Sequence, residues 1–153
     1  MRFHLCAVGR NMPAWIDEGF REYARRMPGG SRLELHAVAA AKAGASGAEG
    51  RADEARRLRG AVPQRARRIA LDGQGRQLTT HDWAEHAREW NRTGEQVAFI
   101  VGGAEGWDER VRAEADACWS LSRLTLPHGL VRIVLAEQLY RVLSIMHNQP
   151  YHR

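Results

Sequence analysis

The sequence predicts an α/β fold with a largely parallel sheet and helices on both faces of that sheet. Short apolar runs alternate with helical patterns along the 153 residues, as in FHLCAV (3–8) and QVAFIVGG (96–103). This alternation favours strands joined by helical crossovers. The second run is apolar at almost every position, which is typical of a strand that is covered on both faces. The length fits one domain, 1–153.

The first third of the chain predicts two strands around a helix. After the strand at 3–8, Asn11 is expected to cap a helix that has Pro13 in its first turn. The apolar residues that share one face of this helix are Met12, Trp15, Ile16, Tyr23 and Met27. A Pro-Gly-Gly turn at 28–30 ends the helix, and the alternating run LELHAVA (33–39) predicts the next strand.

The remaining elements follow from glycines, prolines and caps. Residues 40–50 are small and Gly-rich and predict a mobile loop, after which a basic helix runs to about Gly60. RIALD (68–72) predicts a short buried strand that GQGR (73–76) turns away from the sheet. Thr79 and Asp82 form a capping box, and Asp108 is expected to cap a short helix. A short strand and a loop are expected within 118–129, and a last helix over roughly 130–147.

The charge balance favours a polyanionic partner. Basic residues outnumber acidic ones by 23 to 18, and the net charge is +5. The excess of positive charge is concentrated at 51–68, which contains seven arginines and only two acidic residues, Asp53 and Glu54. Either a solvated helix face or an RNA-binding patch explains this segment.

Several classes of protein are disfavoured by the sequence. Neither an HExxH motif nor a helical pair of histidines is present, because His81 and His86 are five residues apart, and no metal site is expected. Cys6 and Cys118 have apolar neighbours and read as buried thiols. Neither an uncharged run of about 18 residues nor the apolar core of a signal peptide is found, so we expect a cytoplasmic protein without a membrane span.

Three predicted strands end in segments that suit a ligand. These segments are LDG (71–73), VGG (101–103) and SLSRLTLPH (120–128). The glycines do not match a dinucleotide or phosphate-loop fingerprint, and a tight turn would also explain each cluster taken alone. Open parallel sheets bind ligands at the carboxyl ends of their strands, so a site is expected there.

The strings LTLPHGLVRIVLAEQLYR (124–141), VGGAEG (101–106) and PYHR (150–153) resemble the RlmH family of SPOUT-class methyltransferases, and the similarity runs through the whole chain. The resemblance implies a deep C-terminal trefoil knot within roughly 67–153, a homodimer, and S-adenosylmethionine as cofactor. The cofactor contacts that it implies are Leu71, Gly102, Gly103, Leu121, Ser122, Arg123, Leu124, Thr125 and Leu126.

The implied reaction is methylation of N3 of a pseudouridine in 23S rRNA, at the position conventionally numbered 1915, on assembled ribosomes. On this view His152 is the best-placed base, Arg153 either stabilises developing negative charge or holds a phosphate, and Tyr151 either stacks on the target base or hydrogen-bonds to it. The alternative is that Tyr151 packs and the other two residues are hydrated. The RNA contacts expected from this reading are Arg25, Arg26, Arg132 and Arg141.

The last helix is apolar around most of its circumference, which predicts burial and a subunit interface. Glu137 and Arg141 are four residues apart and could pair within the helix, or could instead pair in the active site or across the dimer. The alternatives for function are a SPOUT methyltransferase with another RNA target, a ribosome-binding protein without catalysis, and a nucleotide-binding α/β enzyme. The last is disfavoured by the missing fingerprints.

Overall fold

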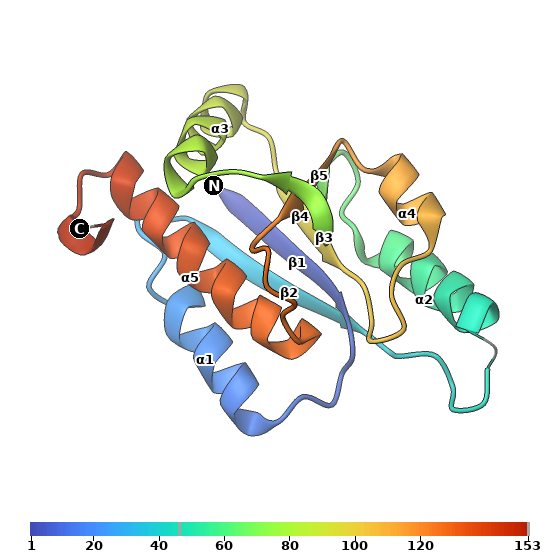
Figure 1. Ribbon diagram of the computed structural model, residues 1–153. Coiled ribbons are helices and arrows are strands. Elements are labelled where there is room, and N and C mark those ends of the chain that lie inside the picture. Colours follow the sequence, from blue (N-terminus) through green and yellow to red (C-terminus); the bar gives the residue numbers. More distant parts are fainter. Residues whose placement is uncertain (46, 153) are drawn as a thin grey trace.

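The computed structural model describes residues 1–45 and 47–152, without the side chain of His152. Five strands form one sheet, and every neighbouring pair in it is parallel (Figure 1). The strands are β1 (Arg2–Val8), β2 (Arg32–Val38), β3 (Arg67–Gln77), β4 (Val97–Val101) and β5 (Ala117–Ser120). Their order in the sheet is β2-β1-β4-β3-β5. The predicted α/β fold with a parallel sheet is therefore confirmed.

Helices cover both faces of the sheet (Figure 1). One face carries α1 (Ala14–Ala24), α3 (Thr80–Thr93) and α5 (His128–Met146), and both α1 and α3 pack on α5. The other face carries α2 (Gly47–Ala61) and the short α4 (Glu109–Glu114). A single 3₁₀ turn, η1 (Pro150–His152), follows α5. None of the helices formed by residues 1–45 and 47–152 has the length and apolar character that a membrane crossing requires.

The two faces of the sheet bury two separate cores. Side chains alternate along a strand, so Phe3 and Leu5 of β1 pack under α1, α3 and α5, while Cys6 packs towards α2. In the larger core the ring of Trp83 stacks on that of Phe99 at a centroid distance of 5.5 Å. Helix α5 adds five residues to this core, Leu135, Ala136, Leu139, Val142 and Leu143.

Local boundaries near the first two helices differ from the prediction. Asn11 does not cap the first helix, because α1 begins at Ala14 and Pro13 is its cap residue, without a side-chain hydrogen bond. Helix α2 begins at Gly47, so the loop predicted over 40–50 ends earlier than expected. Acidic Glu49 lies in the first turn of α2, where a negative charge stabilises the helix dipole.

The capping box of Thr79 and Asp82 is present, and the Asp108 side chain accepts a hydrogen bond from the backbone N–H of Arg110. Both predicted helix starts are therefore confirmed. The trefoil knot expected within 67–153 stays a prediction.

Candidate cofactor cleft and catalytic tail

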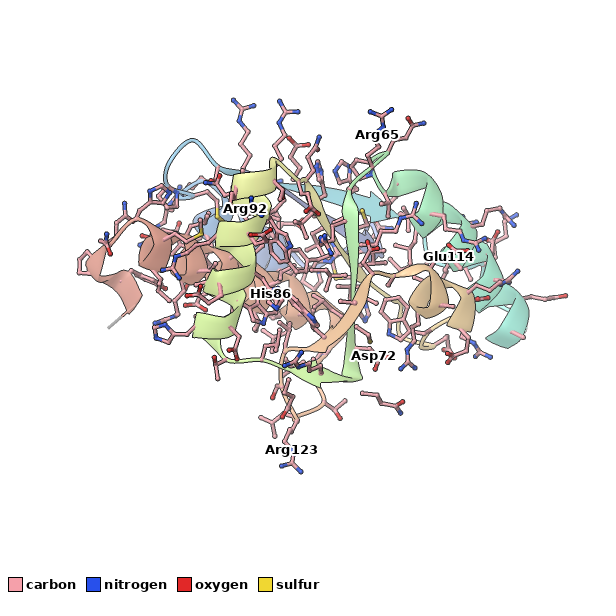
Figure 2. The ribbon with its side chains drawn as sticks, turned by 90° about the horizontal axis from the view of Figure 1, so that it is seen from above. Arg65, Asp72, His86, Arg92, Glu114 and Arg123 are labelled. Atoms are coloured by element: carbon pink, nitrogen blue, oxygen red, sulfur yellow. The ribbon has the colours of Figure 1, made fainter. Side chains whose placement is uncertain are left out.

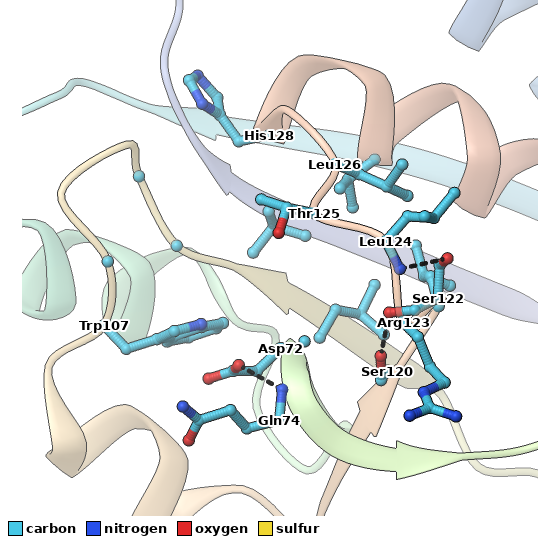
Figure 3. A pocket seen from close by; sticks show the side chains of 18 residues that line it. Asp72, Gln74, Trp107, Ser120, Ser122, Arg123, Leu124, Thr125, Leu126 and His128 are labelled. Carbon is cyan, nitrogen blue, oxygen red and sulfur yellow. Dashed lines mark hydrogen bonds between the residues drawn. The ribbon is translucent and has the colours of Figure 1, made fainter.

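A cleft of about 510 Å³ opens beside an irregular stretch of β3 and the ends of β4 and β5 (Figure 3). Its lining includes every residue that the resemblance assigns to the cofactor: Leu71, Gly102, Gly103, Leu121, Ser122, Arg123, Leu124, Thr125 and Leu126. Three segments that are far apart in the sequence thus meet at one edge of the sheet, as expected for a parallel sheet. That these residues hold S-adenosylmethionine stays a prediction.

The first wall of the cleft is an irregular stretch of β3 that the sequence analysis predicted as a turn away from the sheet. Leu71 and Arg76 both lie opposite Trp119 of β5, so residues 72–75 bulge out between two stretches of regular pairing. Asp72 stabilises the bulge, since its Oδ1 accepts a hydrogen bond from the backbone N–H of Gln74 (2.9 Å). Asp72, Gly73 and Gln74 consequently line the cleft.

Gly75 permits this bulge to close against β5. A Cβ atom at Gly75 would lie 2.6 Å from the carbonyl carbon and 2.7 Å from the amide nitrogen of Trp119. Both are backbone atoms and cannot rotate away, so a side chain at this position would force the two strands apart.

The second wall is the glycine turn after β4. A Cβ atom at Gly102 would lie 3.2 Å from the carbonyl oxygen of Gly106 and 3.3 Å from the Trp107 ring. Gly106 has a φ of +90°, which favours glycine. The turn therefore brings the Trp107 ring towards the cleft, as Figure 3 shows. The sequence analysis missed Trp107, although an aromatic residue directly after a glycine turn at a strand end was a usable signal.

The third wall is the loop after β5. Ser120 Oγ donates to the carbonyl oxygen of Ser122 (2.8 Å), and Ser122 Oγ accepts from the backbone N–H of Leu124 (3.0 Å). These bonds fix the loop, although 74% of Leu124 is exposed. Arg123 projects away from the body of the molecule (Figure 2), so it lines the cleft at its rim.

The charge in the cleft is low. Asp72 supplies one carboxylate, and its Oδ2 lies 3.5 Å from Nε of Arg112. His128, the first residue of α5, lies at the other side of the cleft (Figure 3). A cleft of this volume, lined by leucines and an indole ring, is typical of sites for small ligands with an apolar ring.

Tyr151, the first residue of the predicted catalytic tail, lies against the second half of α5. Its ring packs edge-on against Tyr140 at 4.5 Å, and its hydroxyl group donates to Glu137 Oε1 (3.3 Å). Burial, followed by hydrogen bonding to Tyr23 and the charge of Glu137, raises the pKa of Tyr151 to about 12. The phenol is therefore neutral at physiological pH. We call Tyr23, Arg26, Glu137, Tyr140, Arg141 and Tyr151 the tail cluster.

The pair Glu137–Arg141 forms within the helix, with 2.8 Å between Oε1 and Nη2. This is the simpler of the two arrangements that the sequence allowed. Arg141 Nη1 also donates to the carbonyl oxygen of Tyr151 (3.4 Å), which ties the tail to the helix. The other two predicted catalytic groups, the His152 side chain and Arg153, lie outside the described residues.

The cleft lies at the first turn of α5, whereas the tail cluster packs on the second half of the helix, towards the end from which the C-terminal turn leaves (Figure 1). His128 lines the cleft, and Arg141, which binds the Tyr151 carbonyl group, is 13 residues further along the helix. At 1.5 Å per residue, His128 and Arg141 are about 20 Å apart along the helix axis. The Tyr151 hydroxyl group lies nearer to the cleft, because it binds Glu137, about 14 Å along the helix from His128.

Arg132 is not the RNA contact that the sequence analysis predicted. Its side chain is buried, with 1% of its surface exposed, and Nη2 donates to the carbonyl oxygens of Val8 (3.1 Å) and Gly9 (2.6 Å). Desolvation lowers the pKa of this arginine. The guanidinium group holds the end of β1 against α5 and cannot reach a phosphate in this position.

The other predicted RNA contacts lie beside the tail and away from the cleft. Arg25 and Arg26 both pair with Glu22. The Arg26 guanidinium also lies 4.7 Å from the centre of the Tyr140 ring and 5.7 Å from that of Tyr151. The structure thus brings Arg26, Arg141 and Tyr151 together, and Arg25 precedes Arg26 in the sequence.

Most arginines of the basic segment 51–68 are neutralised by acidic neighbours. Asp53 pairs with Arg56 and Arg57 within α2. The longer-range pairs are Arg59 with Glu114 and Arg67 with Glu95. Of the two interpretations of this segment, these contacts favour a solvated, ion-paired face.

Known proteins that are similar to this chain match it over its full length. A family model described as "Predicted SPOUT methyltransferase" matches residues 1–152. The chain is 47% identical to the ribosomal RNA large subunit methyltransferase H of Ralstonia pickettii, 46% to that of Burkholderia thailandensis and 44% to that of Hydrogenovibrio crunogenus. Each comparison covers 100% of this chain and 99% of the relative. Together with the parallel sheet and the cleft at its carboxyl edge, these matches establish that the chain belongs to the SPOUT methyltransferase family.

Proposed function

We propose that this protein transfers a methyl group from S-adenosylmethionine to N3 of a pseudouridine in 23S rRNA, at the position conventionally numbered 1915, on assembled ribosomes in the cytoplasm. The observation that carries the proposal is that nine positions implied by the family pattern line one cleft of about 510 Å³. The full-length relatives, named ribosomal RNA large subunit methyltransferase H, support the choice of RNA.

The residues of the cleft fit the cofactor. Its volume of about 510 Å³ lies within the usual range for small-ligand sites. Leu71, Leu121 and Leu126 line the cleft, as an adenine ring requires, and Trp107 offers an indole for stacking. The absence of a side chain at Gly102 keeps the space beside Trp107 open. S-adenosylmethionine, when bound, supplies an electrophilic methyl group that needs mainly to be positioned.

The protein must also make the target nitrogen nucleophilic. N3 of pseudouridine carries an imide proton, so a base with a pKa near 7 assists its removal, and His152 is the candidate. Arg153 would stabilise the negative charge that develops on the neighbouring carbonyl oxygens. Tyr151 is neutral and packs on Tyr140, so its ring can serve as a support for the target base.

The proposed active unit is a homodimer in which the tail of one chain completes the cleft of the other. Tyr151 packs on the second half of α5, whereas the cleft lies at the first turn of the same helix, and this separation supports the arrangement. Trp15 and Leu124 are large apolar residues that are 58% and 74% exposed, as residues in a subunit interface would be. In such a dimer Arg25, Arg26 and Arg141 would flank the partner's cleft and could contact RNA phosphates.

The test is transfer of a labelled methyl group to ribosomes that lack the modification. Intact ribosomes, separated large subunits and stripped ribosomal RNA are assayed side by side, with the Gly102→Val variant as the control with a blocked cleft. Label in one pseudouridine of 23S rRNA, with intact ribosomes preferred, is the expected result. Label at another site would identify a SPOUT methyltransferase with a different RNA target. Salt-sensitive ribosome binding without cofactor affinity in calorimetry would identify a non-catalytic binding protein.

A further inference from the structure

Three side chains that can ligate a metal ion converge between β1 and β2. His4 belongs to β1, and Glu34 and His36 belong to the edge strand β2, where His4 lies opposite Glu34. Residues two apart on a strand point to the same face, so Glu34 and His36 both approach His4. One ligand atom of each residue lies within 4.8 Å of the other two. Among the described residues, these three form the cluster of His, Cys, Asp or Glu side chains whose ligand atoms lie this close together.

The distances suit a small divalent ion. Nδ1 of His4 and Nε2 of His36 are 3.0 Å apart, and Oε2 of Glu34 lies 3.9 Å from the first nitrogen and 4.0 Å from the second. A point in the plane of these atoms is about 2.1 Å from all three, which matches zinc–nitrogen and zinc–oxygen bonds. The Glu34 side chain is 49% exposed, so it can adjust its position and leave room for a water ligand.

A hydrogen bond to Gln96 orients the His4 ring for metal binding. Nε2 of His4 lies 2.9 Å from Oε1 of Gln96, and a carbonyl oxygen can only accept a hydrogen bond. Nε2 therefore carries the proton, and the lone pair of Nδ1 points towards His36 and Glu34. Such a bond from the outer nitrogen of a histidine to a carbonyl group is typical of metal sites, since it fixes both the tautomer and the ring orientation. With the His4 side chain only 6% exposed, this orientation is held by packing as well.

We infer that His4, Glu34 and His36 form a binding site for a divalent transition-metal ion such as Zn²⁺. Two imidazole nitrogens and one carboxylate oxygen are ligands that such ions prefer, whereas Mg²⁺ prefers oxygen alone. The site joins β1 to β2, which is otherwise held at the edge of the sheet by one neighbour. It lies between β1 and β2, and neither of these strands lines the cleft, so its role is to stabilise the sheet and not to assist methyl transfer.

The experiment measures binding of Zn²⁺ to the full chain after removal of any affinity tag and treatment with a chelator. Competition with a coloured zinc chelator gives the stoichiometry and the affinity. We expect one Zn²⁺ per chain, an affinity at least tenfold lower in His36→Gln and in Glu34→Gln, and no change in the matched control His81→Gln, whose residue is exposed on α3. Zn²⁺ should raise the melting temperature of the wild type and not that of His36→Gln, and Mg²⁺ should leave both unchanged.

His36→Gln is preferred to a substitution of His4, because His4 is buried and its loss could prevent folding. Cofactor binding and circular dichroism of the variants establish that they are folded. Visible absorption of the Co²⁺-loaded protein reports directly on nitrogen and oxygen ligands. The inference is overturned if the wild type binds no Zn²⁺ at micromolar concentration, or if His36→Gln binds it as tightly as the wild type does. Neither outcome bears on the methyltransferase proposal.

Discussion

Heterodimers with two inactivating changes can show whether the active site is shared by two chains or formed within one chain. The changes are placed either on different chains or on the same chain. The first change deletes residues 151–153, and the second is Gly102→Val in the cleft. In heterodimer A each chain carries one of the changes. In heterodimer B one chain carries both and the other is wild type. The two heterodimers therefore contain the same substitutions and differ only in how they are placed.

The structure sets the expected activities. A Cβ atom at Gly102 already approaches the Gly106 carbonyl oxygen to 3.2 Å and the Trp107 ring to 3.3 Å, so the larger valine closes that cleft. In the proposed arrangement the tail of one chain completes the cleft of the other, so on this reasoning no active site forms within a chain. In a two-fold dimer, heterodimer A then keeps one of its two sites and about half of the wild-type activity, and heterodimer B keeps none.

The assay uses two different affinity tags and purification on both, followed by the initial rate of labelled methyl transfer to ribosomes. Equal melting temperatures of the two heterodimers would exclude differences in folding. The reasoning is refuted if heterodimer B retains about half of the activity and heterodimer A has none, because that pattern requires tail and cleft to belong to the same chain.

Three further predictions concern the cleft and its supports. Trp107→Ala should raise the dissociation constant for S-adenosylmethionine about tenfold, since stacking of a base on an aromatic ring contributes about 1–3 kcal/mol; calorimetry showing unchanged affinity would exclude this contact. Gly75→Ala should lower the free energy of unfolding by about 3 kcal/mol in denaturant titration, because its Cβ would lie 2.6 Å from the backbone of β5. Gly73→Ala, with no atom within 4 Å of its Cβ, is the matched control, and equal stability of the two variants would contradict the argument. Hydrogen bonds from the side chain and then the backbone of Arg110 lower the pKa of Asp108 from 3.8 to about 2, so the stabilisation it gives is complete above about pH 5 and is lost progressively as the pH falls through 2. Asp108→Ala should therefore cost about 0.5–2 kcal/mol at pH 7 and much less at pH 2, and an equal cost at the two pH values would show that the cap acts by another route.

The main features of the fold followed from local patterns. The apolar run that forms β4 is buried at all five positions, Val97–Val101, as its composition required. The capping box at Thr79 is equally local, because its partners are three residues apart. The cleft was predictable from the three strand ends, since the general behaviour of parallel sheets places them together.

What the sequence did not reveal depends on contacts between distant segments. The bulge at 72–75 exists because β5, about 45 residues later, pairs with β3 on both sides of it. The sequence around Arg132 does not indicate a partner for its guanidinium group, because the carbonyl oxygens that accept its hydrogen bonds belong to the end of β1. Glu34 and His36 meet His4 through the β1–β2 register, which no helical spacing rule describes. In each case the partner is set by tertiary structure and not by neighbours in the sequence.

The position of α5 in the chain has a consequence for how the protein is made. Leu135, Leu139 and Leu143 complete the larger core, and β1 lacks its partner β4 until residues 97–101 have been synthesised. A nascent chain in which α5 has not yet been synthesised therefore leaves the larger core without this cover. Contacts of such high sequence separation slow folding and favour transient association with other apolar surfaces. The larger core can therefore close only after α5 has left the ribosome that makes the chain.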